Sequence, residues 1–299
     1  MPMQVFNGLS AFPITPADEA GRVDTAALRG LVRRLTDARV DSIGLLGSTG
    51  SYPYLDRAER RRAVEAVVDE VGGRTPVLAG IGALRTDDAV RFGQDARAAG
   101  ATAVLLAPVS YTPLLDREVF THFSTVADAV GLPLCIYNNP STTHFTFSPS
   151  LIAQLSQVPN IRAVKNPAPD ASAVAAHLAE LRAQVPDGFA LGYSVDMNAA
   201  EALLAGGDAW YSVVAGLFPT PVLAMVRAVQ AGDAVEARRL NLWMRPMWDL
   251  FAAHTSLRVM YAAANQLGLC RTAPPRPILP LDEAAQHQVA AVLDAMELR

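Results

Sequence analysis

Short apolar segments alternate with longer amphipathic segments along the first three quarters of the chain. Turn residues separate most of these segments by roughly 25–35 residues, the spacing of a β-strand followed by an α-helix. Continuous apolar strands are typical of a parallel sheet covered by helices. The pattern therefore predicts a (β/α)8 TIM barrel. Its eight predicted strands are Gly8–Phe12, Ser42–Leu46, Pro76–Ile81, Ala103–Ala107, Leu132–Tyr137, Ile161–Lys165, Phe189–Gly192 and Trp210–Val214.

Residues that can cap a first helical turn precede the predicted helices. Asp56, with Glu59 three residues later, resembles a capping box, and Ser148 is followed by a proline at the first helical position. The other expected caps are Asp24 (for a helix over Thr25–Ala38), Asp116, Asp170 and Asp196. A doubly wound open sheet is the alternative fold, but it normally has a glycine-rich first turn, which this chain lacks.

The pattern changes after residue 222, where the predicted strands stop. Four helices are expected there, and Pro246 should split or kink the second. The proline-rich segment 272–280 should be an ordered connector without a helix. The sequence thus predicts a barrel over residues 1–222 and a helical C-terminal extension over 223–299. The four expected helices are Leu223–Ala231, Ala234–Ala253, Ser256–Leu267 and Leu281–Leu298.

Bulk composition restricts the possible partners and location. The 299-residue chain is 51% hydrophobic, enough to bury a large core, and its net charge of −4 gives no reason to expect nucleic acid or an anionic membrane as partner. The segment Met1–Ser10 does not resemble a secretory signal, and no apolar run is long enough to span a bilayer. Cys135 and Cys270 are isolated, as expected for core thiols. We expect a cytoplasmic protein.

Lys165 is the only lysine among 25 basic residues, the other 24 being arginine. It ends the apolar segment Ile161–Lys165. A guanidinium can replace the charge of lysine but stays protonated, whereas a desolvated amine can attack a carbonyl and form a Schiff base. The alternative is that a single lysine persisted by chance. The position at the end of a buried strand favours catalysis.

The carboxyl ends of the strands carry the active site in a parallel barrel. Gly47, Ser48 and Thr49 follow the second predicted strand, where glycines would let the backbone turn sharply and expose N–H groups to a small carboxylate or phosphate. An ordinary turn is the alternative. Tyr137 ends the fifth strand and would bring a phenol near Lys165 as a proton carrier, unless its ring only packs on a helix.

Metal chemistry is not expected from the histidine pattern. His122, His144, His177, His254 and His287 are scattered, with no HExxH or paired spacing. They are interpreted as surface or structural residues, and no metal or organic cofactor is expected.

Several motifs in the same order resemble the dihydrodipicolinate synthase and N-acetylneuraminate lyase family over nearly the whole chain. They are Gly8-Leu9-Ser10-Ala11-Phe12-Pro13-Ile14-Thr15-Pro16, Gly47-Ser48-Thr49-Gly50, Tyr137-Asn138-Asn139-Pro140, Val164-Lys165 and Pro275-Arg276-Pro277-Ile278-Leu279-Pro280-Leu281. The resemblance implies that Lys165 forms a Schiff base with pyruvate or another 2-oxo acid, with Tyr137 as the central proton donor and acceptor.

The resemblance also implies roles for other strand-end residues. Ser48 would be the relay hydroxyl, Thr49 would bind the keto acid's carboxylate, and a main-chain contact would fall near Tyr211. Family members are typically homotetramers built from tight dimers, in which a tyrosine reaches into the neighbour's site. Tyr111 is the nearest match, although Ser110 occupies the relay position itself.

Departures from the family pattern concern the second substrate. Ser51 replaces the usual acidic residue, and Thr142 stands where dihydrodipicolinate synthases carry an arginine that binds the aldehyde's carboxylate. A threonine cannot replace a bidentate clamp. The loop after the seventh strand, with Ser194 and Asp196, lacks the acidic run of sialic acid lyases.

These features predict a Schiff-base lyase or aldolase that condenses pyruvate with an aldehyde or cleaves the product. Burial of Lys165 would favour the neutral amine by desolvating the ammonium form. Two alternatives stay open. One is an authentic 4-hydroxy-tetrahydrodipicolinate synthase that uses aspartate semialdehyde. The other is a keto-acid-binding protein without turnover.

Overall fold

Eight parallel strands form a closed barrel in the computed structural model, which describes residues 3–299. Each strand pairs with the next in the chain, and β8 closes the ring on β1 with Tyr211 opposite Ser10. The predicted TIM barrel is confirmed, with every strand end within two residues of its expected position. The strands are β1 Gly8–Ala11, β2 Ser42–Leu45, β3 Val77–Gly80, β4 Ala103–Leu106, β5 Leu134–Tyr137, β6 Ile161–Pro167, β7 Ala190–Ser194 and β8 Ala209–Ser212.

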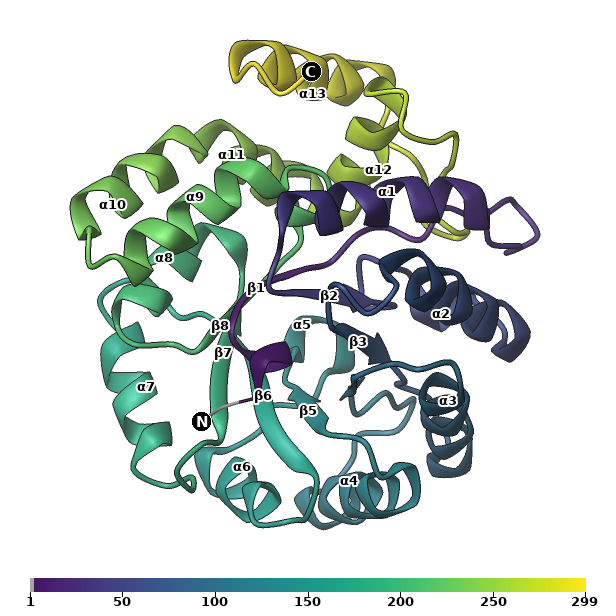
Figure 1. The fold of residues 1–299 in the computed structure, drawn as a ribbon, viewed down its shortest axis with the longest axis vertical. Helices are drawn as coiled ribbons and strands as arrows, with labels where there is room; N and C mark the ends of the chain where they lie inside the picture. The colour runs from purple at the N-terminus through teal and green to yellow at the C-terminus, as the bar shows by residue number, and fades with distance from the viewer. Residues whose placement is uncertain (1–2) are drawn as a thin grey trace.

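Helices surround the barrel as an outer ring (Figure 1). The short 3-10 helix η1 (Gln4–Phe6) contributes Val5 and Phe6 to the cluster of side chains inside the barrel. The ring comprises α1 Thr25–Ala38, α2 Arg57–Val71, α3 Thr86–Ala98, α4 Asp116–Val130, α6 Pro149–Ser156, α7 Val174–Arg182, α8 Ala199–Leu204 and α9 Pro219–Gln230. Shorter elements are η2 Tyr52–Tyr54, α5 Pro140–Thr143, η3 Asp196–Asn198 and η4 Val214–Gly216.

Three of the expected helix caps are confirmed. The side chain of Asp24 accepts from the first turn of α1, and Ser148 accepts from the N–H of Leu151 in α6. Asp56 accepts from the N–H of Glu59 at the start of α2. The reciprocal half of the expected capping box is absent within residues 3–299, because Glu59 instead accepts from the N–H of Val23, 2.7 Å away.

The other three expected caps are wrong. Asp116 lies inside α4, whose cap position is Leu115, and Asp170 precedes α7 by four residues without a side-chain cap. Asp196 starts η3, but its carboxylate accepts from the N–H groups of Val213 and Val214 after β8 instead. For Asp196, donors from a distant segment thus replace those of the local first turn.

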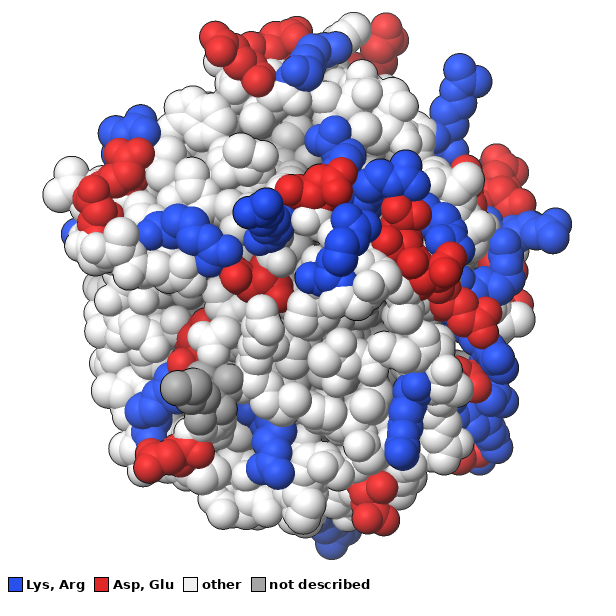
Figure 2. Space-filling view, viewed as in Figure 1, with Lys and Arg blue, Asp and Glu red and all other residues white. Residues whose placement is uncertain are grey.

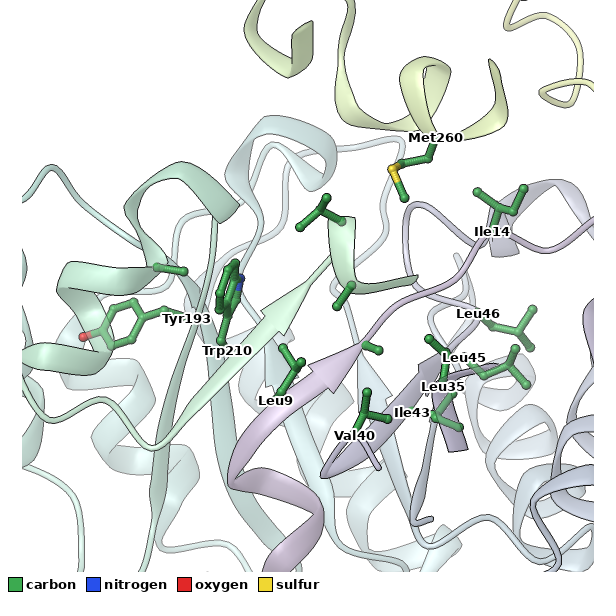
Figure 3. Packing of buried hydrophobic residues seen from close by; sticks show 14 of the residues in the cluster. Leu9, Ile14, Leu35, Val40, Ile43, Leu45, Leu46, Tyr193, Trp210 and Met260 are labelled. Carbon is green, nitrogen blue, oxygen red and sulfur yellow. The ribbon is translucent and has the colours of Figure 1, made fainter. Parts of the chain in front are cut away.

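Apolar side chains form two layers on either side of the strands. Leu9, Ile43, Leu45 and Trp210 lie between barrel and helices, and Met260 joins this cluster from the C-terminal extension (Figure 3). Alternate strand residues fill the barrel interior instead. The strands β3 to β8 therefore contribute apolar side chains to both layers.

Four helices follow the ring: α10 Ala234–Trp243, α11 Arg245–His254, α12 Ser256–Gln266 and α13 Glu283–Ala295. Pro246 lies in the first turn of α11, so the predicted split is confirmed, and residues 272–280 contain no helix. The expected boundary at residue 222 falls within α9, which packs against β1 and α1. We therefore propose that the extension begins at α10.

The surface carries both signs of charge. Basic and acidic residues are interspersed on the face seen in Figure 2. Ion pairs on the protein include Arg33–Glu70 and Arg57–Asp95. Within residues 3–299, no helix is long and apolar enough to cross a bilayer.

Candidate active site

Lys165 lies on β6 with its side chain inside the barrel and is 3% exposed. Its Nζ lies 4.0 Å from the ring centroid of Phe12 and 4.3 Å from that of Tyr137, with Tyr211 at 5.7 Å. Within residues 3–299, Nζ forms no salt bridge. The amine is thus held among three ring faces with no carboxylate in contact.

Two further groups near the amine, the Cys135 thiol and the Tyr211 phenol, are neutral. Burial raises the pKa of the Cys135 thiol to about 12 and that of the Tyr211 phenol well above its usual value. The hydroxyl of Tyr211 lies 3.6 Å from the Cys135 sulfur. Both groups stay uncharged at neutral pH, so neither is a counter-ion for the ammonium form of Lys165.

Phe12 packs against Lys165 because one glycine of β2 and one of the loop after β2 leave room for its ring. A Cβ on Gly44 would lie 2.1 Å from the Phe12 ring, and one on Gly47 would lie 2.6 Å from it. Only glycine fits at these positions while Phe12 keeps its place. Gly47, expected to line the substrate site, therefore makes room for the Phe12 ring that contacts Lys165.

Tyr137 ends β5 beside Lys165, and these two residues are register partners. The Tyr137 hydroxyl lies 3.1 Å from Ser48 Oγ and accepts a hydrogen bond from Asn139 Nδ2 at 3.0 Å. Ser48, from the loop after β2, is thus placed to exchange protons with the phenol. The structure brings Lys165, Tyr137 and Ser48 together.

The loop after β2 turns in an unexpected way. Its left-handed residues are Leu46 (φ 57°) and Ser51 (φ 55°), and neither flanking glycine has a positive φ. A Cβ on Gly50 would lie 3.0 Å from the Leu46 backbone, so this glycine permits the close approach of the turn. Thr49 is buried, and within residues 3–299 the backbone N–H groups of Ser48 and Thr49 donate no hydrogen bond to protein acceptors. These two N–H groups can bind a carboxylate.

Ser51 belongs to a second group of hydroxyls. Its Oγ lies 3.1 Å from the hydroxyl of Tyr261 in α12, which donates to the carbonyl of Thr15 at 3.3 Å. A hollow of about 610 Å³ adjoins them, also lined by Tyr54 and Arg271. The side chain at position 51 is thus a neutral hydroxyl that contacts the C-terminal extension.

The loop after β4 does not reach the Tyr137–Ser48 pair in this chain. Tyr111 is 98% exposed, and Ser110 Oγ donates to the carbonyl of Thr112 at 2.7 Å. Within residues 3–299, neither side chain hydrogen-bonds to Tyr137.

Three further candidates follow β5 or belong to β7 and the segment after it, and each hydrogen-bonds to groups other than Lys165. Thr142 is exposed, and its hydroxyl donates to the carbonyl of Asn139 at 3.3 Å. Ser194 Oγ donates to the carbonyl of Asn166 at 3.1 Å. Burial raises the pKa of Asp196, which accepts from Trp210 Nε1 at 2.8 Å and from two backbone N–H groups. Asp196 therefore ties strand ends together.

Sequence reasoning assigned no role to Phe12, Asn139 or Tyr261. Phe12 and Asn139 lie inside motifs that carry the family resemblance. Their positions just after strands could have identified them as candidate site residues. Tyr261 had none, because it meets Ser51 from 210 residues away. Within residues 3–299, no three His, Cys, Asp or Glu side chains are grouped as metal ligands.

Comparisons with known proteins agree over almost the full length. The family model described as the dihydrodipicolinate synthetase family matches residues 5–296. A 4-hydroxy-tetrahydrodipicolinate synthase of Methylococcus capsulatus is 36% identical, covering 85% of this chain and 86% of its own. A dihydrodipicolinate synthase structure from Agrobacterium tumefaciens is 58% identical, with a TM-score of 0.95, covering 97% of this chain and 98% of its own. The corresponding Aquifex aeolicus structure is 28% identical, with a TM-score of 0.91, covering 98% and 99%. The chain belongs to the dihydrodipicolinate synthetase family.

Proposed function

We propose that this family member is a class I lyase or aldolase in which Lys165 forms a Schiff base with pyruvate or another 2-oxo acid. The observation that carries the proposal is the buried amine of Lys165 beside the Tyr137–Ser48 pair. An amine can act as the nucleophile, and the iminium that it forms is an electron sink that needs no metal. The relatives named 4-hydroxy-tetrahydrodipicolinate synthase support the same chemistry.

The reaction starts when the neutral amine of Lys165 attacks the C2 carbonyl. Loss of water gives an iminium, which withdraws electrons from C3. Tyr137 accepts the C3 proton, the C3–H electron pair becomes the C2=C3 bond, and the iminium becomes an enamine. C3 of the enamine attacks an aldehyde carbon, the aldehyde oxygen takes the proton held by Tyr137, and the iminium forms again. Addition of water to this iminium then releases the product and frees Lys165. The reverse sequence cleaves a 4-hydroxy-2-oxo acid, and a dehydration variant uses the same iminium.

The keto acid's carboxylate would bind at the loop after β2. The N–H groups of Ser48 and Thr49 and the Thr49 hydroxyl supply donors there, and the main chain near Tyr211 would contact the acid from β8. Ser48 would relay protons between Tyr137 and the substrate oxygen released as water. Thr142, Ser110 and Ser194 would belong to the second-substrate side.

The second substrate distinguishes the proposal from its main alternative. Curated relatives are named 4-hydroxy-tetrahydrodipicolinate synthase, which favours aspartate semialdehyde. The exposed Thr142 stands at the position of the carboxylate-binding arginine and offers one hydroxyl. We therefore propose an aldehyde whose binding does not depend on a bidentate arginine clamp.

A family member that binds keto acids without turnover is the third reading. The contacts of Lys165 with Tyr137, and of Tyr137 with Ser48, argue against it, because a binder needs no proton relay beside the amine.

We also propose a cytoplasmic homotetramer, a dimer of dimers, with Tyr111 reaching into the neighbouring subunit. Large apolar side chains are exposed in several places, and two of these groups are the basis of the proposal. Tyr111, Leu84 and Leu115 lie on the loops after β3 and β4. Val235 and Leu242 project from α10. Two separate apolar surfaces fit two kinds of subunit contact.

A substrate screen tests the function. Pyruvate consumption is measured with a panel of aldehydes that includes aspartate semialdehyde, and pyruvate release with 4-hydroxy-2-oxo acids. Turnover with an aldehyde other than aspartate semialdehyde is the expected result. Efficient turnover of aspartate semialdehyde alone would establish the synthase, and no turnover of any pair would favour the binder. Lys165→Arg is the inactive control.

A further inference from the structure

We propose that Asn139 is a positioning residue for proton transfer, because its side-chain amide donates a hydrogen bond to the phenol oxygen of Tyr137 and stabilises negative charge on that oxygen. This inference rests on the proposed function. Tyr137 is the group that takes the C3 proton, so a neighbour that stabilises its charged form promotes the enamine step.

The geometry of the contact is direct. Asn139 Nδ2 lies 3.0 Å from Tyr137 Oη, within the range of a normal hydrogen bond. Ser48 Oγ lies 3.1 Å from the same oxygen. Because an amide nitrogen can only donate, Asn139 occupies an acceptor site on the phenol oxygen. The phenol's own hydrogen is left for Ser48 or for the substrate.

The backbone of Asn139 is fixed independently of Tyr137. Asn139 precedes Pro140, which disfavours helical backbone there, and its φ and ψ are −142° and 76°. Its carbonyl accepts from the N–H groups of Thr142 and Thr143, each at 3.0 Å, and from the Thr143 hydroxyl at 3.0 Å. The start of α5 therefore holds Asn139 in place.

Ser141 orients the amide plane. Its Oγ donates to Asn139 Oδ1 at 2.8 Å, so the NH₂ end of the amide points to Tyr137. The hydrogen bonds thus run from Ser141 through Asn139 and Tyr137 to Ser48. Ser141 donates to Asn139, and Asn139 donates to the phenol oxygen of Tyr137, which bears the negative charge.

The test separates imine formation from proton transfer. Deuterium incorporation from D₂O into the pyruvate methyl group, followed by NMR, reports C3 proton removal. Borohydride trapping at saturating pyruvate reports the imine on Lys165. In Asn139→Leu, which is similar in size but cannot donate, exchange should fall roughly tenfold to a hundredfold, the effect expected for a hydrogen bond to a charged group. Trapping should reach the wild-type level.

The pH profile identifies the role. Without the amide donor, exchange in Asn139→Leu should require a higher pH than in the wild type, because the charged phenol oxygen has lost a stabilising partner. Ser141→Ala should lower exchange by a smaller factor, and Ser150→Ala, an exposed serine on α6, should leave it unchanged. A purely structural loss would lower trapping and exchange together.

The possible failures are distinguishable. Wild-type exchange with an unchanged rate and pH profile in Asn139→Leu would overturn the role of Asn139 alone. A shift to lower pH would also overturn it, since the amide would then be accepting from the phenol. No exchange by the wild type would contradict the proposed function itself.

Discussion

Gly47→Ala should disturb Lys165 through Phe12. The new Cβ would lie 2.6 Å from the Phe12 ring, whereas ordinary contact begins at 3.4 Å, so the ring must retreat by about 0.8 Å. It cannot move freely, because Lys165 Nζ and the ring of Tyr211 flank it with centroid distances of 4.0 and 6.0 Å. Overpacking of this kind costs roughly 1–3 kcal/mol of unfolding free energy.

Urea unfolding measures the stability change, and borohydride trapping with pyruvate measures the effect on Lys165, which should react more slowly. Gly30→Ala is the matched control. Gly30 lies in α1 with no atom within 4 Å of the added Cβ, so this variant should gain about 0.5–1 kcal/mol. Combining Gly47→Ala with Phe12→Leu should recover part of the loss, because a smaller side chain relieves the contact. Wild-type stability and trapping in Gly47→Ala would refute the reasoning.

Three further predictions concern proton transfer and stability. Tyr137→Phe keeps the ring beside Lys165 but removes the hydroxyl, so pyruvate C3 exchange should fall about 10²–10⁴-fold; a rate near wild type would remove Tyr137 from the relay. Burial lowers the pKa of His122 to about 4 from 6.5, so the unfolded chain takes up this proton first as the pH falls. The free energy of unfolding should therefore decline by roughly 3 kcal/mol between pH 6.5 and 4. In urea titrations, His122→Gln should make the unfolding free energy less dependent on pH over this range. An unchanged pH dependence would contradict the role given to His122. Asp196→Asn places an NH₂ group against N–H donors and should lower the free energy of unfolding by about 3 kcal/mol in the same assay. A decrease below about 0.5 kcal/mol would show that the protein does not depend on these hydrogen bonds.

The fold was predictable because the strand signal is local. Each strand is a short apolar segment between turn residues, and the parallel barrel follows from their repetition. The helices that start at Asp24, Asp56 and Ser148 were predictable for the same reason, since a cap acts within four residues.

Contacts between distant segments could not be read from the sequence. Asp196 resembles a local cap, but it accepts hydrogen bonds from residues beyond β8. The turn after β2 uses left-handed Leu46 and Ser51, while Gly47 serves to make room for Phe12. In each case tertiary packing overrides the local preference of the residue type.

Part of the site was accessible from chemistry alone. The single lysine at the end of a predicted strand indicated Lys165, and the closed barrel brings Tyr137 and Ser48 to it. The Asn139 contact was not foreseen, since its amide could equally have faced solvent or the helix backbone. The side-chain direction emerges only once α5 fixes the Asn139 carbonyl.

Borohydride reduction in the presence of pyruvate tests the central claim most directly. Mass spectrometry of the digested protein should show the reduced pyruvate adduct on the peptide that contains Lys165 and on no other peptide. Lys165→Arg should show none. An unmodified Lys165 peptide at saturating pyruvate would contradict the Schiff-base mechanism.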